Sequence, residues 1–127
     1  MTNAAETSLL GGWGESVAGA YLRRRGYRLL GVNHRCRGGE VDIIARKGRF
    51  IVFVEVKMRK NAHFAQAREF VTPAKQGRII LAAQSWLMRN PSKLQPRFDV
   101  IEVYAPEGYR TKDPTINHIK NAFDTFS

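Results

Sequence analysis

Residues 39–57, GEVDIIARKGRFIVFVEVK, decide the fold of this chain. Two apolar runs, 40–45 and 50–57, flank the polar stretch 46–49, which is the pattern of a β-hairpin. The second run is β-branched or aromatic on both faces, and that is typical of a central strand buried on two sides. The stretch therefore predicts a hairpin whose second strand lies inside a sheet.

The expected hairpin pairs Ala45 with Phe50 across a four-residue loop. This register puts Glu55 opposite Glu40 and makes Asp42 its diagonal neighbour on the same face, about 7–8 Å away at the backbone. A slip of one residue would move Asp42 to the other face of the sheet. The register therefore predicts that two carboxylates converge.

The end of the second strand carries charge where its neighbours are apolar. Glu55 and Lys57 share a face, and an uncompensated buried charge costs several kcal/mol. A Mg²⁺ or Mn²⁺ ion, or two such ions, would compensate Asp42 and Glu55, because Mg²⁺ takes one or two carboxylates together with water and phosphate oxygens. The backbone carbonyl of Val56 is a further ligand in this scheme. Lys57 is suited to orient or deprotonate an attacking water, so the residues predict hydrolysis at phosphorus.

Apolar spacing, caps and breakers predict the other elements. They are a helix over 14–25 ended by Gly26, a strand over 27–33, a helix from Thr72-Pro73 to Asn90, and a strand over 97–104. Residues 115–123 fit either a strand or a helix. This order predicts an α/β fold with a mixed central sheet flanked by helices, in one nuclease-like domain over residues 1–127.

The net charge of +10 is concentrated in one part of the sequence. Residues 22–60 hold 12 of the 21 Lys and Arg but only three of the 11 acids. A globular chain with such a basic segment favours nucleic acid as its partner. The expected phosphate contacts are Arg23, Arg24, Arg25, Arg35, Arg37, Arg46, Lys47, Arg59 and Lys60.

Cysteine and hydropathy indicate the compartment. The single cysteine, Cys36, cannot form an intramolecular disulfide, and with His34, His63 and His118 it lacks the paired spacing of a zinc site. No apolar run has the length of a signal peptide core or a membrane span. We therefore expect a cytoplasmic protein that contacts no membrane.

The ordered set of motifs resembles a known superfamily. Gly39-Glu40-Val41-Asp42 and Phe53-Val54-Glu55-Val56-Lys57, with Glu15 on a preceding helix and Lys75-Gln76 opening the next, resemble the PD-(D/E)xK restriction-endonuclease-like proteins. More narrowly, the chain looks like the small bacterial YraN-type proteins, a family of predicted endonucleases related to archaeal Holliday junction resolvases. One departure is that Val41, not proline, precedes Asp42.

The resemblance implies roles for individual residues. It implies a restriction-endonuclease-like fold, a metal held by Asp42 and Glu55, Lys57 as the catalytic lysine and Glu15 as an accessory acid near the metal. Lys75 or Gln76 would be a helper on the helix. The implied activity is a metal-dependent endonuclease acting on DNA rather than RNA, with branched or damaged DNA as candidate substrates. A homodimer would suit such an enzyme, because resolvase-like enzymes commonly need two active sites.

Other interpretations of these residues stay open at this point. Glu15 could instead favour the positive end of its helix, and Asp99 could be a salt-bridge partner at the end of the sheet. For Glu40 we expect a pairing with a nearby arginine. The alternative function is a non-catalytic nucleic-acid-binding protein that retains the nuclease fold. Intact Asp42, Glu55 and Lys57 argue against it, because a binding module has no physical reason to keep acids inside its most basic segment.

Overall fold

The computed structural model describes residues 2–60 and 71–124, with side chains from residue 12 onward. Within this part of the chain, five strands form one sheet in the order β1-β2-β3-β4-β5. Strands β3 and β4 run parallel, and every other neighbouring pair is antiparallel, so the sheet is mixed as predicted. The elements are α1 (Thr2–Arg24), β1 (Arg28–Cys36), β2 (Gly39–Lys47), β3 (Phe50–Arg59), α2 (Pro73–Arg89), β4 (Gln95–Tyr104), the 3₁₀ turn η3 (Gly108–Arg110) and β5 (Thr115–Phe123).

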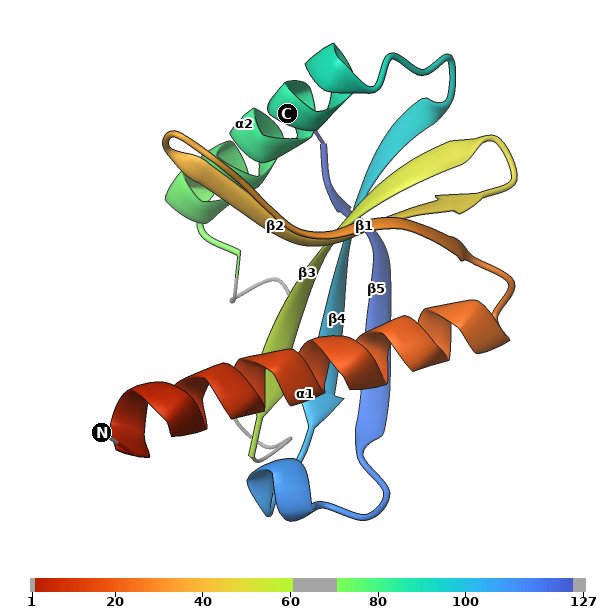
Figure 1. Cartoon of the computed structure of the whole chain (residues 1–127). Coiled ribbons are helices and arrows are strands. Elements are labelled where there is room, and N and C mark those ends of the chain that lie inside the picture. The colour runs from red at the N-terminus through yellow and green to blue at the C-terminus, as the bar shows by residue number, and fades with distance from the viewer. Residues whose placement is uncertain (1, 61–70, 125–127) are drawn as a thin grey trace.

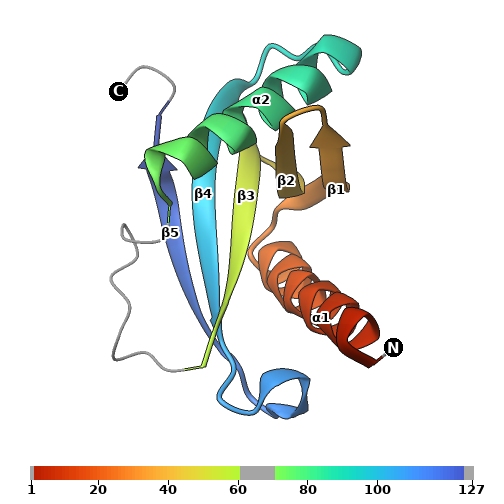
Figure 2. The same ribbon diagram turned by 90° about the vertical axis from the view of Figure 1, so that its left-hand side faces the viewer.

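The two helices cover opposite faces of the sheet (Figures 1 and 2). Ala18 and Leu22 of α1 pack in one buried apolar cluster, and Ile79 and Ala82 of α2 pack in another. Residues of β3 alternate between the clusters, with Ile51 and Phe53 toward α2 and Val52 and Val54 toward α1. The predicted α/β architecture with flanking helices is confirmed, and it is that of a restriction-endonuclease-like fold. Neither helix of the described chain is long and apolar enough to span a bilayer.

Local signals place the helix ends. Gly26 has a φ of +85°, its amide donates to the carbonyl of Arg23 at 3.0 Å, and the amide of Tyr27 donates to the carbonyl of Leu22 at 2.9 Å. These bonds form the Schellman motif, for which glycine is preferred. At the start of α2, the Oγ1 of Thr72 accepts the amide of Lys75 at 3.2 Å. Both caps agree with the sequence, whereas α1 begins at Thr2 rather than at the expected residue 14.

The hairpin register differs from the expected one by two residues. Lys47 pairs with Phe50 and Ala45 pairs with Val52, so the loop has two residues rather than four. Gly48 sits first in this loop with a φ of +57°, and glycine at that position is the preference of type II′ turns, whose twist suits a hairpin. The predicted pairing of Ala45 with Phe50, and of Glu55 with Glu40, is therefore wrong. A shift of two keeps every side chain on its face.

Residues 115–123, which the sequence left as strand or helix, form the edge strand β5. Strand β5 pairs with β4 from Tyr104 and Thr115 to Phe98 and Phe123. Its burial pattern is irregular, and its pairing with β4 shifts register between Phe98 and Val100, close to Asn121 with its φ of +52°. That irregularity explains why the apolar spacing of the segment did not distinguish strand from helix.

Gly39 is where the turn between β1 and β2 meets helix α2. A Cβ atom added here would clash with the backbone carbonyl oxygen of Arg78 and would lie 3.0 Å from the backbone nitrogen of Ala82. Backbone atoms within a helix cannot move aside cheaply, so we expect Gly39→Ala to lower the free energy of unfolding by about 1–3 kcal/mol. Urea denaturation followed by circular dichroism measures this change.

The matched control is Gly77→Ala within α2. No atom lies within 4 Å of a Cβ added at Gly77, so the substitution should raise the free energy of unfolding by about 0.5–1 kcal/mol through helix propensity. Equal stability of Gly39→Ala and the wild-type protein would contradict the close packing of the turn on α2.

Candidate active site

The candidate site lies where strands β2 and β3 separate. Their pairing ends at Ile43 and Val54, while β3 remains paired with β4 as far as Arg59. Beyond Val54, the next β3 amide on the open side, that of Val56, donates to the Oδ2 atom of Asp42 at 2.7 Å. A carboxylate thus replaces the missing strand as the hydrogen-bond partner of β3.

Strand β2 is irregular at this point. Val41 and Ile44 both pack in the cluster on the α2 side, although unbroken alternation would place residues three apart on opposite faces. The interruption falls at Asp42 and lets its side chain lie against the open edge of β3. Because the N–H and C=O groups of one strand residue point to the same side, the carbonyl of Val56 faces the same edge as its amide.

Asp42 and Glu55 are close enough to affect each other electrostatically. Burial raises the pKa of Asp42 to about 7, and the negative charge of Glu55 adds to the rise, against a lowering by the amide of Val56. The Glu55 side chain is only 5% exposed. Continuing the observed register by one step puts Asp42 opposite Glu55 rather than diagonal to it. The two acids predicted to converge do lie together.

Two lysines lie against Glu55. The Nζ of Lys75, on the first turn of α2, lies 2.6 Å from the Oε2 of Glu55, and the Nζ of Lys57 lies 3.5 Å from the same oxygen. Burial lowers the pKa of Lys57, and the neighbouring Lys75 lowers it further. Burial also acts to lower the pKa of Lys75, but its hydrogen bond and charge interaction with Glu55 outweigh this and raise it. The pair therefore combines a firmly charged lysine with one that gives up its proton more readily.

We call the point where β2 and β3 separate, beyond Ile43 and Val54, the fork. Glu15 lies near the fork on helix α1, which covers the face of the sheet opposite α2. Burial raises its pKa, opposed by a hydrogen bond with Asn33 and by the charge of Arg35. The negative charges of Glu40 and Glu55 also raise it, so Glu15 is within electrostatic reach of the acidic pair. The preceding residue, Gly14, is buried against the side chain of Met58, which allows α1 to cross β3 closely.

Gln76, the other residue expected to help on α2, has a local role. Its Nε2 donates to the backbone carbonyl of Val71 at 2.9 Å, which ties the helix to the segment before it. Glu40 pairs with arginines on the rim, at 3.5 Å from Arg35 and 3.8 Å from Arg78, as expected. Gln76 thus contacts the segment before α2, and Glu40 contacts arginines at the rim, while its negative charge also acts on Glu15.

The donor set suits a hard divalent cation. Two carboxylates and one carbonyl, from Asp42, Glu55 and Val56, are oxygen ligands of the kind that Mg²⁺ and Mn²⁺ prefer. Burial and, after it, the charge of Glu55 raise the pKa of Asp42, and a cation would offset the cost of keeping both acids charged here. Among the described side chains, no three of the His, Cys, Asp and Glu residues are grouped closely enough to make a metal site by themselves. The carbonyl and ligands from substrate or water would therefore have to complete the coordination.

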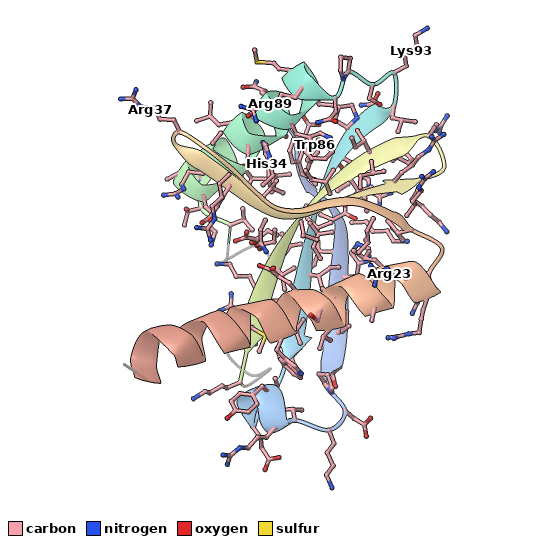
Figure 3. All side chains as sticks on the ribbon, in the orientation of Figure 1. Arg23, His34, Arg37, Trp86, Arg89 and Lys93 are labelled. Atoms are coloured by element: carbon pink, nitrogen blue, oxygen red, sulfur yellow. The ribbon has the colours of Figure 1, made fainter. Side chains whose placement is uncertain are left out.

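The expected phosphate contacts divide into separate groups. Arg37 lies at the turn between β1 and β2, near Arg35, whereas Arg23 lies at the far end of α1 (Figure 3). Lys60 is exposed just after the end of β3. Arg59 lies 3.7 Å from the fully buried Glu102 of β4, so it serves the interior of the sheet. The remaining members, Arg24, Arg25, Arg46 and Lys47, share the region of Arg23.

Sequence reasoning did not identify the buried acid Glu102. The Oε1 of Glu102 accepts hydrogen bonds from Tyr104 and Asn117, both at 2.9 Å. A charged residue with apolar neighbours at 100, 101 and 103 was a visible signal, of the same kind that led to Glu55. His63, whose spacing argued against zinc, lies outside the described residues.

Comparison with known proteins identifies the family. The model of the uncharacterised protein family UPF0102 matches residues 14–103, which span every residue of the candidate site. The chain belongs to the UPF0102 family. This is the YraN family, so the resemblance inferred from the motifs is confirmed.

Relatives in the UPF0102 family match over nearly their whole lengths. A UPF0102 protein of Geobacter sulfurreducens is 47% identical over 119 residues, covering 91% of this chain and 89% of the relative. A UPF0102 protein of Geobacter metallireducens is 46% identical over 116 residues, covering 91% and 92%. One from Caldanaerobacter subterraneus is 43% identical over 115 residues, covering 90% and 93%. The UPF0102 match therefore concerns the chain as a whole.

Proposed function

We propose that this UPF0102 protein is an endonuclease that hydrolyses phosphodiester bonds in DNA with the help of Mg²⁺ or Mn²⁺. The observation that carries the proposal is the fork itself. The amide of Val56 donates to the Oδ2 of Asp42 at 2.7 Å, which holds Asp42 near Glu55, and the Nζ of Lys57 lies 3.5 Å from the Oε2 of Glu55 on the same strand. Nothing in the packing of an ordinary sheet requires this combination of buried acids and a lysine with a lowered pKa.

Asp42, Glu55 and the carbonyl of Val56 would hold the cation, with Glu15 at the rim. The bound ion would neutralise charge that develops on the phosphate. Lys57 would orient a water and accept its proton, and burial, which lowers its pKa, supports this role. As the water oxygen bonds to phosphorus, the bond from phosphorus to the leaving deoxyribose oxygen breaks, and that oxygen takes up a proton from solvent. Lys75 remains charged and can contact an equatorial phosphate oxygen.

The function is tested by cleavage of labelled single-stranded, duplex, flap and four-way DNA, with MnCl₂ or with EDTA. We expect cleavage of at least one structure with Mn²⁺ and none with EDTA. Absence of cleavage from every substrate, together with DNA binding, would overturn the proposal in favour of a nucleic-acid-binding protein that retains the fold. Matching RNA substrates distinguish a deoxyribonuclease from a ribonuclease.

Lys75 gives a prediction that does not depend on turnover. Its ammonium group contacts Glu55 at 2.6 Å and thus repels a second cation at the same acid. We expect Lys75→Met to bind Mn²⁺ at least about fivefold more tightly, because removal of a neighbouring positive charge favours the ion. Isothermal titration calorimetry of the protein without DNA measures the affinity. Lys93→Met, which removes an exposed lysine beyond α2, is the control and should leave the affinity unchanged.

A further inference from the structure

We propose that the end of the sheet remote from Glu55 binds the backbone of a double-helical DNA arm, so that the preferred substrate carries a duplex arm beside the cut. The inference deepens the proposed endonuclease function and rests on it. The residues concerned are exposed and basic, and we call them the distal basic surface: Arg23, Arg24, Arg25, Arg28, Arg46, Lys47 and Arg49.

These residues form one continuous surface although they come from three parts of the chain. The Nζ of Lys47 donates to the backbone carbonyl of Arg25 at 2.6 Å, which joins the loop after α1 to the end of β2. Arg28 is the cross-strand partner of Arg46, which joins the start of β1 to the same region. In Figure 1 the end of α1, the start of β1 and the turn between β2 and β3 lie on one side of the molecule.

The positive charge of the distal basic surface is not balanced locally. Among the described side chains, none of its seven residues pairs with a carboxylate, whereas Arg35 and Arg78 near the site both pair with Glu40. Like charges on cross-strand partners such as Arg28 and Arg46 are destabilising. Self-repelling cations kept together at one end of a sheet indicate a polyanionic partner.

Three of these cations lie over aromatic rings, and Arg49, whose guanidinium is 5.6 Å from the centre of the Phe50 ring, is one of them. The Arg25 guanidinium is 5.1 Å from the centre of the Tyr21 ring, and the Lys47 ammonium is 5.5 Å from that of Tyr27. Cation–π contact positions a side chain without neutralising its charge. The surface is therefore partly preorganised and still fully cationic.

The geometry of β3 sets the length of the arm. Phe50, the partner of Lys47 beside the turn, is five residues from Glu55, which at about 3.3 Å per residue is about 16 Å. Duplex DNA rises about 3.4 Å per base pair, so this separation corresponds to about five base pairs. An arm shorter than this would reach the acids without reaching the distal basic surface.

The first experiment measures binding in EDTA, without catalysis. Fluorescence anisotropy is recorded for the full chain with branched DNA whose duplex arm has 3, 6 or 12 base pairs, over a range of salt. We expect affinity to rise at least about tenfold between 3 and 6 base pairs and little thereafter. In the variant Arg28→Gln/Arg46→Gln this rise should largely disappear, and the salt slope should fall by about two.

The control removes the same charge elsewhere. Arg110→Gln/Lys112→Gln changes two exposed residues at and after η3 and should keep both the rise and the salt slope. Affinity that does not depend on arm length, or an equal loss in the two variants, would overturn the inference.

A second experiment separates this inference from the proposed function. The same DNA series is incubated with MnCl₂, and cleavage is expected to follow the arm dependence of binding. If no DNA is cleaved, the endonuclease proposal fails, and the binding series in EDTA still decides the role of the distal basic surface. If all arm lengths are cleaved equally, the endonuclease proposal stands and the inference fails.

Discussion

Glu55→Gln is expected to reduce Mn²⁺-dependent DNA cleavage by about a thousandfold or more. The substitution keeps the size of a side chain that is 5% exposed, but it removes one of the two carboxylates proposed to hold the ion. It also removes the negative charge that both lysines contact. DNA affinity in EDTA should be unchanged or higher, since a negative charge near the phosphate is lost. Single-turnover cleavage and anisotropy measure the two effects separately.

Glu40→Gln is the matched control for this change. Glu40 is a half-exposed acid on the neighbouring strand β2, and its partners are Arg35 and Arg78 at the rim. We expect its cleavage rate to stay within about threefold of wild type, because screened ion pairs at the surface contribute little. Cleavage by Glu55→Gln at the rate of Glu40→Gln would show that the buried acid is not catalytic.

Asp99→Ala is expected to lower the free energy of unfolding by about 3–5 kcal/mol, because it removes one partner of a buried pair. Asp99 is fully buried and accepts two hydrogen bonds from Arg97, at 2.8 and 2.9 Å. His118 contacts it at 2.7 Å, and the amide of Asn121 donates to it at 3.0 Å. Its loss would leave the nearly buried guanidinium of Arg97 without its counter-ion. Urea denaturation at pH 7 measures the change.

The effect of Asp99 should depend on pH in a definite direction. Burial acts to raise its pKa, but the hydrogen bonds from His118, Arg97 and Asn121 outweigh burial and hold the pKa below the usual 3.8. A carboxyl whose pKa is lower in the folded state stabilises the fold above its unfolded pKa, and this stabilisation is lost as the pH falls through the folded value. The stability difference between wild type and Asp99→Asn should therefore shrink below about pH 4.

The exposed acid Asp113 supplies the control for this pair of measurements. Asp113→Ala should change the free energy of unfolding by no more than about 0.5 kcal/mol at any pH. A similarly small change for Asp99→Ala would mean that the network of Arg97 and His118 does not hold β4 to β5.

The sequence predicts those parts of the fold that depend on neighbouring residues. Gly26 and Thr72 mark helix ends because capping is a local interaction. The α2-side placement of Glu55 follows from the alternation of side chains along a strand, with Phe53 on the same face. The predicted hairpin register is wrong by two residues, because the polar stretch 46–49 resembles a four-residue loop whereas the turn at Gly48 has only two.

The site depends on contacts that no local pattern contains. Asp42 accepts a hydrogen bond from the amide of Val56 because β2 separates from β3 at this point. Lys75 contacts Glu55 because of the way in which α2 packs on the sheet. Arg59 looked like a surface cation in the sequence because its partner, Glu102, lies more than forty residues away. Such pairings appear only when the strands are assembled.

The most direct measurement is a calorimetric titration of MnCl₂ into the protein without DNA, compared with Asp42→Asn and Glu55→Gln. If Asp42 and Glu55 share a cation at the fork, the wild-type protein will take up Mn²⁺ with a measurable heat, and either substitution will weaken binding by at least about tenfold. Uptake that is equal in all three proteins, or absent from the wild-type protein even after an uncleavable oligonucleotide is added, would contradict a metal centre at this place.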